Sequence, residues 1–200
     1  MCCWRSCSKL FRLMKDFIRR GFNDPKREEV YNGLLKRTYH LYNDTIVAYA
    51  KRNTSGLNYY SPFAVATMPL DDIRQRLESF VQDTALLSLD PSATNEEKKK
   101  TIYAEHHELT TALFYHLMTD THWNEETKAF YQELLLSPTI DSMDAQLLTS
   151  ALLLALLLAF DARKFATLLY LYQYATDPQV KQRALVGWAL TLPKVEITLY

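Results

Sequence analysis

The chain has 200 residues, of which 48% are hydrophobic and 23% are charged, and its formal net charge at pH 7 is +0. These proportions are typical of a globular protein that buries a sizeable core. A nucleic-acid-binding protein needs clustered Lys and Arg to neutralise phosphates, so the balanced charge argues against a nucleic-acid partner. Only four glycines are present and strand-like alternation is scarce, so we predict an all-α fold.

All three cysteines, Cys2, Cys3 and Cys7, lie within the first seven residues. Disulfides among them would close very short loops and restrain almost nothing, so they do not indicate a disulfide framework. The same end carries a charge every three or four residues, which is unlike the apolar core of a secretory signal. We therefore expect a cytoplasmic protein.

The segment from residue 4 to residue 20 has the pattern of a basic amphipathic helix. Its apolar face comprises Leu10, Leu13, Met14, Phe17 and Ile18. Residues 1–40 hold ten basic against four acidic side chains, so the rest of the chain is acidic. We expect residues 1–22 to form a helix that docks on the helices that follow. Attachment to a membrane surface, aided by acylation of Cys2 or Cys3, is the alternative.

An N-terminal helical region is expected over residues 23–121, with an irregular connection at 53–69. Apolar spacing predicts its helices at about residues 26–52, 70–89 and 94–119.

The expected helix at 26–52 carries an apolar side along its whole length. That side comprises Val30, Leu34, Leu35, Tyr39, Tyr42, Ile46 and Tyr49. The length of this helix predicts a break or a bend near Asn43 and Asp44.

Three aromatic residues, Tyr59, Tyr60 and Phe63, lie in the connection at 53–69. They are candidates for a partner-binding surface. Aromatic side chains in a loop also anchor the loop to its own core, and we favour this alternative because aromatic burial is the larger energy.

From residue 122 to residue 200 the predicted helices are joined by short links. They span about residues 125–136, 143–160, 162–175 and 178–192. The leucine-rich stretch at 145–160 is shorter than the roughly 20 residues that span a bilayer. We therefore predict a helix at the centre of the C-terminal core, with antiparallel helix pairs stacked around it.

One join has a specific pattern, with Asp177 and Pro178 followed by Val180 and Lys181. Asp can cap a helix and Pro suits the first helical position. The segment resembles a HEAT repeat, in which an Asp-Pro turn joins two antiparallel helices and a Val and a basic residue follow. Tetratricopeptide repeats are also helix pairs, but their Trp, Gly, Tyr and Pro spacing is not evident here.

The HEAT resemblance implies a binding scaffold, because such arrays usually bind proteins. Tyr170 and Tyr174 are the candidates for a partner surface in this half, since they lie four residues apart. They also lie off the apolar face of their helix. Packing on a neighbouring repeat is the alternative, and we favour it slightly because aromatic side chains readily fill helix interfaces.

Residues with possible acid–base or ligand chemistry gather between Glu105 and His122. They are Glu105, His106, His107, Glu108, His116, Asp120 and His122. His106 and His107 are adjacent and point about 100° apart, unlike the paired ligands of a helical zinc site. We therefore assign no catalytic residue, cofactor site or metal ligand, and keep a small helical enzyme or a ligand- or metal-binding bundle as the alternative.

These observations predict an all-α antiparallel bundle that passes into HEAT- or TPR-like stacked helix pairs, an α-solenoid. We expect a non-catalytic scaffold or structural subunit with a protein partner, and a peripheral membrane protein attached through residues 1–22 as a second alternative. Residues 194–200 alternate polar and apolar side chains and form no polar cap. Either the chain is a fragment or this tail covers the last helix pair, and self-association stays open.

Overall fold

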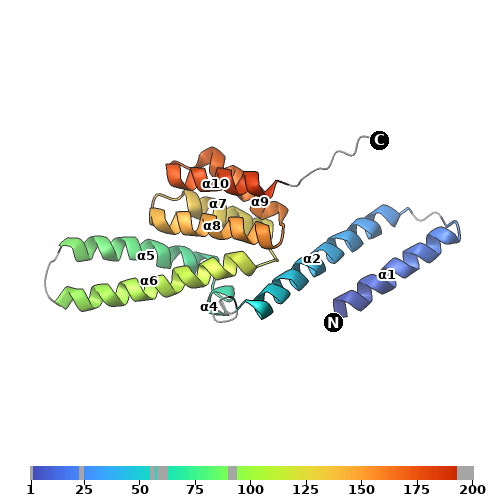
Figure 1. The fold of residues 1–200 in the computed structure, drawn as a ribbon, viewed down its shortest axis with the longest axis horizontal. Helices are drawn as coiled ribbons and strands as arrows, with labels where there is room; N and C mark the ends of the chain where they lie inside the picture. The colour runs from blue at the N-terminus through green and yellow to red at the C-terminus, as the bar shows by residue number, and fades with distance from the viewer. Residues whose placement is uncertain (1, 23–24, 55–56, 58–62, 90–93, 193–200) are drawn as a thin grey trace.

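The computed structural model describes residues 2–22, 25–54, 57, 63–89 and 94–192. Every regular element within these residues is a helix, which confirms the all-α prediction (Figure 1). In chain order the helices are α1 (Cys2–Arg19), α2 (Arg27–Asn53), α4 (Phe63–Ala66), α5 (Leu70–Leu89), α6 (Thr94–Thr119), α7 (Glu125–Leu136), α8 (Ser142–Leu158), α9 (Ala162–Tyr174) and α10 (Pro178–Thr191).

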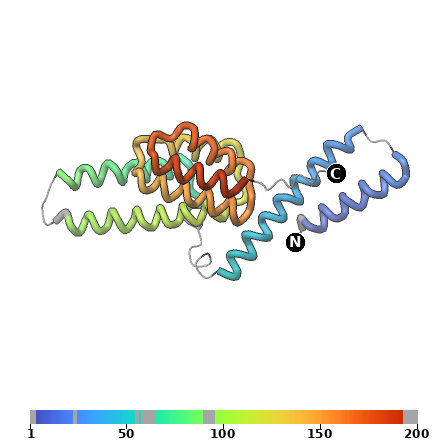
Figure 2. Tube along the Cα trace, turned by 45° about the horizontal axis from the view of Figure 1, so that its top comes forward, coloured from blue at the N-terminus to red at the C-terminus, as the bar shows by residue number. Residues whose placement is uncertain are grey.

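Three helix pairs, α5–α6, α7–α8 and α9–α10, follow one another along the chain. Helix α6 packs on α8, and α8 packs on α10; on the other side α5 meets α7, and α7 packs on α9. The compact end formed by α7 to α10 sits against one end of the long α5–α6 pair (Figures 1 and 2). Each of the later pairs therefore covers the pair before it.

Helix α8 lies at the centre of this core, as its leucine-rich sequence predicts. Leu148, Ala151 and Leu152 are fully buried, and Ala155 and Leu156 are nearly so. Small alanines let neighbouring helices approach closely, and the leucines fill the space between them. Among the described residues, no helix is long and apolar enough to cross a membrane.

Local capping explains why the last four helices begin where they do. The side chains of Asn124, Asp141, Asp161 and Asp177 each precede a helix and accept a hydrogen bond from a backbone N–H of its first turn. Such a bond satisfies a donor that the helix itself cannot pair. These boundaries are encoded within a few residues of sequence, and they agree with the predicted boundaries to within two residues.

Helices α1 and α2 form a hairpin that extends away from the helix stack (Figure 1). The side chains of Tyr39 and Asn43 both donate to the carbonyl oxygen of Phe160, at 2.9 and 3.0 Å. Of the break or bend predicted near Asn43 and Asp44, the break is wrong, because α2 is continuous from Arg27 to Asn53. The hydrogen bonds of Tyr39 and Asn43 attach α2 to the stack there.

Candidate functional site

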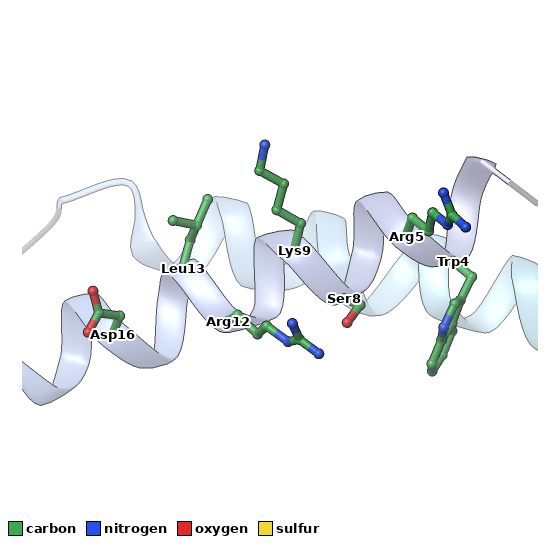
Figure 3. A pocket seen from close by; sticks show the side chains of 7 residues that line it. All are labelled: Trp4, Arg5, Ser8, Lys9, Arg12, Leu13 and Asp16. Atoms are coloured by element: carbon green, nitrogen blue, oxygen red, sulfur yellow. The ribbon is translucent and has the colours of Figure 1, made fainter.

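The outward face of α1 combines cationic side chains with apolar edges. Figure 3 shows Arg5, Lys9 and Arg12 on the side of α1 that is turned away from α2. Trp4 and Leu13 point to opposite sides of the same helix. The helical period of 3.6 residues produces this arrangement from the sequence. The basic face therefore lies between two apolar edges.

Helix α2 covers only the middle of the apolar face of α1. Cys7 on α1 and Leu34 on α2 are buried. One neighbouring helix cannot cover a face as wide as this one, so side chains on both edges stay exposed. One edge carries Trp4, Phe11 and Ile18, and the other carries Leu13 and Phe17. Trp4 is the most exposed of them, at 65%.

The hollow on this face measures about 550 Å³, and its lining residues, from Trp4 to Asp16, all belong to α1. A hollow walled by the long side chains of one helix has no rigid enclosure, so it does not fit a small-molecule cavity, which is concave and largely preformed. Asp16 pairs with Arg20 at 2.9 Å. Within the described residues no salt bridge engages Arg5, Lys9 or Arg12, so this face is cationic.

The apolar side predicted for α2 is largely uncovered. Leu35, Tyr42 and Tyr49 are exposed, and Tyr31 extends the same stripe by one turn. Tyr42 exposes 61% of its surface. Sequence periodicity identified most of these residues, but it carries no information on which neighbour covers them.

Tyr170 and Tyr174 lie together on the surface of α9. Their ring centroids are 4.6 Å apart, and Tyr174 exposes 60% of its surface. They form one exposed aromatic pair, and their role as a partner surface remains a prediction. Tyr59 and Tyr60 lie outside the described residues, as does the side chain of Phe63. The tail at residues 194–200 also lies outside them.

The predicted repeat turn forms a well-connected start to α10. Asp177 accepts from the backbone N–H of Gln179 at 2.7 Å and from the hydroxyl of Ser142, which begins α8. These bonds lower the pKa of Asp177. Pro178 occupies the first helical turn and Val180 is buried. The ammonium of Lys181 lies over the Tyr172 ring, 5.8 Å from its centroid.

The residues between Glu105 and His122 do not form one cluster, because they lie at two places along α6 and beyond its end. Midway along α6, His106 bonds through Nε2 to Oδ1 of Asp144 on α8, at 3.0 Å. Its ring stacks on Phe80 at 3.5 Å. Glu105 and His106 line a hollow of about 300 Å³ beside Phe80, whereas His107 and Glu108 are exposed. His106 thus joins α5, α6 and α8.

At the C-terminal end of α6, His116, Asp120 and His122 line a second hollow of about 350 Å³ together with Asp44 of α2. The two carboxylates there are engaged in the fold, because Thr121 donates to Asp44 and Asp120 accepts from the backbone N–H of His122. The described part of the chain contains no group of three or more His, Cys, Asp or Glu residues that could hold a metal ion.

Two buried polar residues, Asp144 and Lys164, did not emerge as important from the sequence. Lys164 donates to the carbonyl oxygen of Leu117, and burial lowers the pKa of Lys164 to about 8. A signal was present, because Lys164 lies four residues before the buried Leu168, and Asp144 lies four residues before the buried Leu148. A charged residue in line with an apolar face indicates a buried polar contact.

Comparison of the chain with the models of known protein families, with curated proteins and with solved structures revealed no match. The resemblance to HEAT repeats therefore remains a prediction.

Proposed function

We propose that this chain is a non-catalytic helical-repeat protein whose C-terminal helix pairs bind another protein. The stacking order supports a repeat, since α6, α8 and α10 follow one another on one side, and α5, α7 and α9 on the other. This order is expected of an α-solenoid, in which each pair contacts its neighbours. Interaction with a protein partner inside the cytoplasm is part of the proposal.

The exposed apolar surface of the last described pair carries this proposal. Tyr170 and Tyr174 form an aromatic patch on α9, and Leu185, Val186 and Leu190 are exposed on α10. Exposed apolar patches of this kind mark protein contacts. Tyrosine suits such contacts because it buries a large area with few rotatable bonds.

A helical enzyme fits the observations less well. Its candidate residues lie at two separate places, midway along α6 and at its C-terminal end, where His106 is bonded to Asp144 and Asp120 to the His122 backbone respectively. Catalytic groups must converge on one reacting atom. The scaffold is therefore the better proposal.

The test captures proteins from cells of the source organism on the tagged full-length chain. The key variant is the double substitution Tyr170→Ser and Tyr174→Ser, and the matched control is Leu86→Ser with Leu89→Ser at the exposed end of α5. Thermal melting establishes that the variants are folded, because substitutions at exposed positions change stability by only about 0.5 kcal/mol.

A protein retained by the wild type and the α5 control but lost by the tyrosine variant would support the proposal. Identical capture by all three chains would contradict it. Light scattering is run in parallel, because a dimer that the tyrosine variant dissolves would identify a second copy as the occupant of this surface.

A further inference from the structure

We propose that the N-terminal hairpin binds an anionic lipid surface, with the Trp4, Phe11 and Ile18 edge of α1 immersed at the level of the headgroups. This goes beyond the scaffold function and does not depend on it, because the surface lies on α1 and α2 and leaves α9 and α10 free. A helix that lies in a membrane interface has Trp, Phe or Leu on one face and Lys or Arg on the other. Helix α1 has this composition.

The geometry of the hairpin extends this edge onto α2. Successive residues of a helix are about 100° apart, which places Trp4, Phe11 and Ile18 on one side of α1 and Leu13 on the other. Figure 3 shows this separation for Trp4 and Leu13. Since α1 and α2 run antiparallel, the same spacing turns the exposed stripe of α2 to the Trp4 side. The combined surface, here called the apolar flank, comprises Trp4, Phe11, Ile18, Tyr31, Leu35 and Tyr42.

The stack leaves most of the apolar flank open. Helix α2 meets the stack through Asn43, His40 and Asp44, which contact Phe160, His122 and Thr121. On the helical wheel His40 and Asp44 lie on the opposite side of α2 from Tyr31, Leu35 and Tyr42. Tyr39, which also donates to Phe160, lies at the edge of the flank, beside Leu35 and Tyr42. A flat surface can therefore approach the α1 part of the flank together with Tyr31 and Leu35, and the stack meets the flank only beyond them.

The net positive charge of the hairpin favours an anionic partner. Residues 1–53 hold twelve basic and five acidic side chains, whereas the rest of the chain holds eleven basic and eighteen acidic. Two hairpins would repel each other, and an anionic bilayer attracts each of them. Lys15 and Arg19 lie next to the Trp4 edge, so their long stems can extend along it towards lipid phosphates. Trp and Tyr, which the flank supplies, are enriched where bilayer and water meet.

The shape of the flank favours a bilayer over an acidic protein. The hollow nearest to it is formed by side chains of one helix and provides no groove for a peptide or a helix. A lipid surface needs no groove, because it adapts to any apolar edge with cations beside it.

The fluorescence of Trp4 provides a direct test on the full chain. Of the three tryptophans, Trp123 is buried and Trp188 is partly buried, so Trp4 alone is exposed at the surface. The chain is mixed with phosphatidylcholine vesicles, with or without about 30% phosphatidylserine. We expect binding and a blue shift of emission only with phosphatidylserine, and reversal in about 0.5 M salt. In Trp4→Phe the shift should vanish while the chain still cosediments with the vesicles.

Two matched variants on α1 test the orientation. Phe11→Ser with Ile18→Ser removes the immersed edge and should weaken binding by at least about tenfold. Leu13→Ser with Phe17→Ser removes nearly as much exposed apolar surface from the opposite edge and should change binding less than about twofold. Reversing the charges of Arg5, Lys9 and Arg12 to Glu should abolish binding. All variants are compared by circular dichroism before use.

Three results would overturn the proposal: no binding to anionic vesicles, equal binding to vesicles without phosphatidylserine, or equal losses from the two edges. Poly-glutamate, as a soluble acidic polypeptide, tests whether the hairpin binds an acidic protein instead of a lipid surface. If it binds the chain and displaces it from vesicles while Trp4 emission stays unshifted, the hairpin is a protein-binding element and the lipid assignment is wrong. None of these results bears on the Tyr170 and Tyr174 capture, so the two proposals fail separately.

Discussion

Lys164 of α9 donates its Nζ to the carbonyl oxygen of Leu117, 2.8 Å away near the end of α6. The same ammonium donates to the carbonyl oxygen of Asp120 and lies 5.4 Å from the ring centroid of Trp123. The last carbonyls of a helix have no partner within the helix and attract positive charge. A side chain from a later helix thus completes the end of α6.

Replacing Lys164 by Met should destabilise the protein by about 1–3 kcal/mol, because it keeps the apolar stem but leaves two carbonyl oxygens without their donor. Urea unfolding measures the change. Lys181→Met is the control, since the Lys181 ammonium lies at the surface over Tyr172, and it should change stability by less than about 0.5 kcal/mol. Equal stabilities of the two variants would show that the Lys164 bonds contribute nothing.

Stability should rise with pH between about 8 and 10. Burial lowers the pKa of Lys164 to about 8 from 10.5, so in this window the folded chain releases a proton that the unfolded chain keeps. Stability rises with pH wherever the unfolded state binds more protons. Above about pH 10 the trend reverses, because burial raises the pKa of Tyr131 and only the unfolded tyrosine ionises. Melting temperatures measured at a series of pH values should show this rise in the wild type, and Lys164→Met should not show it.

Acid should also destabilise the fold through His116. Burial lowers the pKa of this histidine from 6.5, so as the pH falls below about 6.5 the unfolded chain takes up a proton before the folded chain does. The wild type should therefore lose stability on acidification relative to His116→Asn, which cannot titrate. If the melting temperatures of the two proteins fall by the same amount between pH 7.5 and about 5, this account is contradicted.

His106 and Asp144 should be coupled. The single substitutions His106→Ala and Asp144→Ala each leave a buried polar group without its partner, whereas the double substitution removes both. The loss of unfolding free energy in the double variant should therefore be smaller than the sum of the two single losses, by about 0.5–3 kcal/mol. Chemical denaturation of the wild type, the two single variants and the double variant measures this coupling. Additive losses would mean that the bond between Nε2 and Asp144 contributes no stability.

Two helical glycines should respond in opposite directions to replacement by Ala. A Cβ at Gly33 would meet nothing within 4 Å, so Gly33→Ala should stabilise α2 by about 0.5–1 kcal/mol. A Cβ at Gly187 would lie 3.0 Å from Leu168 Cδ1 and 3.3 Å from Leu153 Cβ. Overpacking there should exceed the helical gain, with a net loss of about 1 kcal/mol. Melting temperatures that change in the same direction would contradict this account.

The sequence by itself determined the long helices and their ends, because these depend on residues close together in the chain; the one-turn helix α4, inside the connection expected to be irregular, did not emerge from it. Asp161 caps α9 through the backbone N–H groups of residues two and three positions later. Leu148 and Leu152 follow the helical period that buries one side of α8. Interactions of this range are visible in a single segment, so the predicted boundaries agree closely with the structure.

Only the tertiary structure decided which surfaces are covered and which polar groups meet. Asn43, expected to interrupt α2, bonds to Phe160 from 117 residues away, and His106 meets Asp144 on another helix instead of its neighbours in sequence. Periodicity places Trp4 and Tyr42 on apolar faces, but their exposure depends on how many helices pack against the hairpin. Partners distant in the chain are brought together by packing, and no local pattern encodes them.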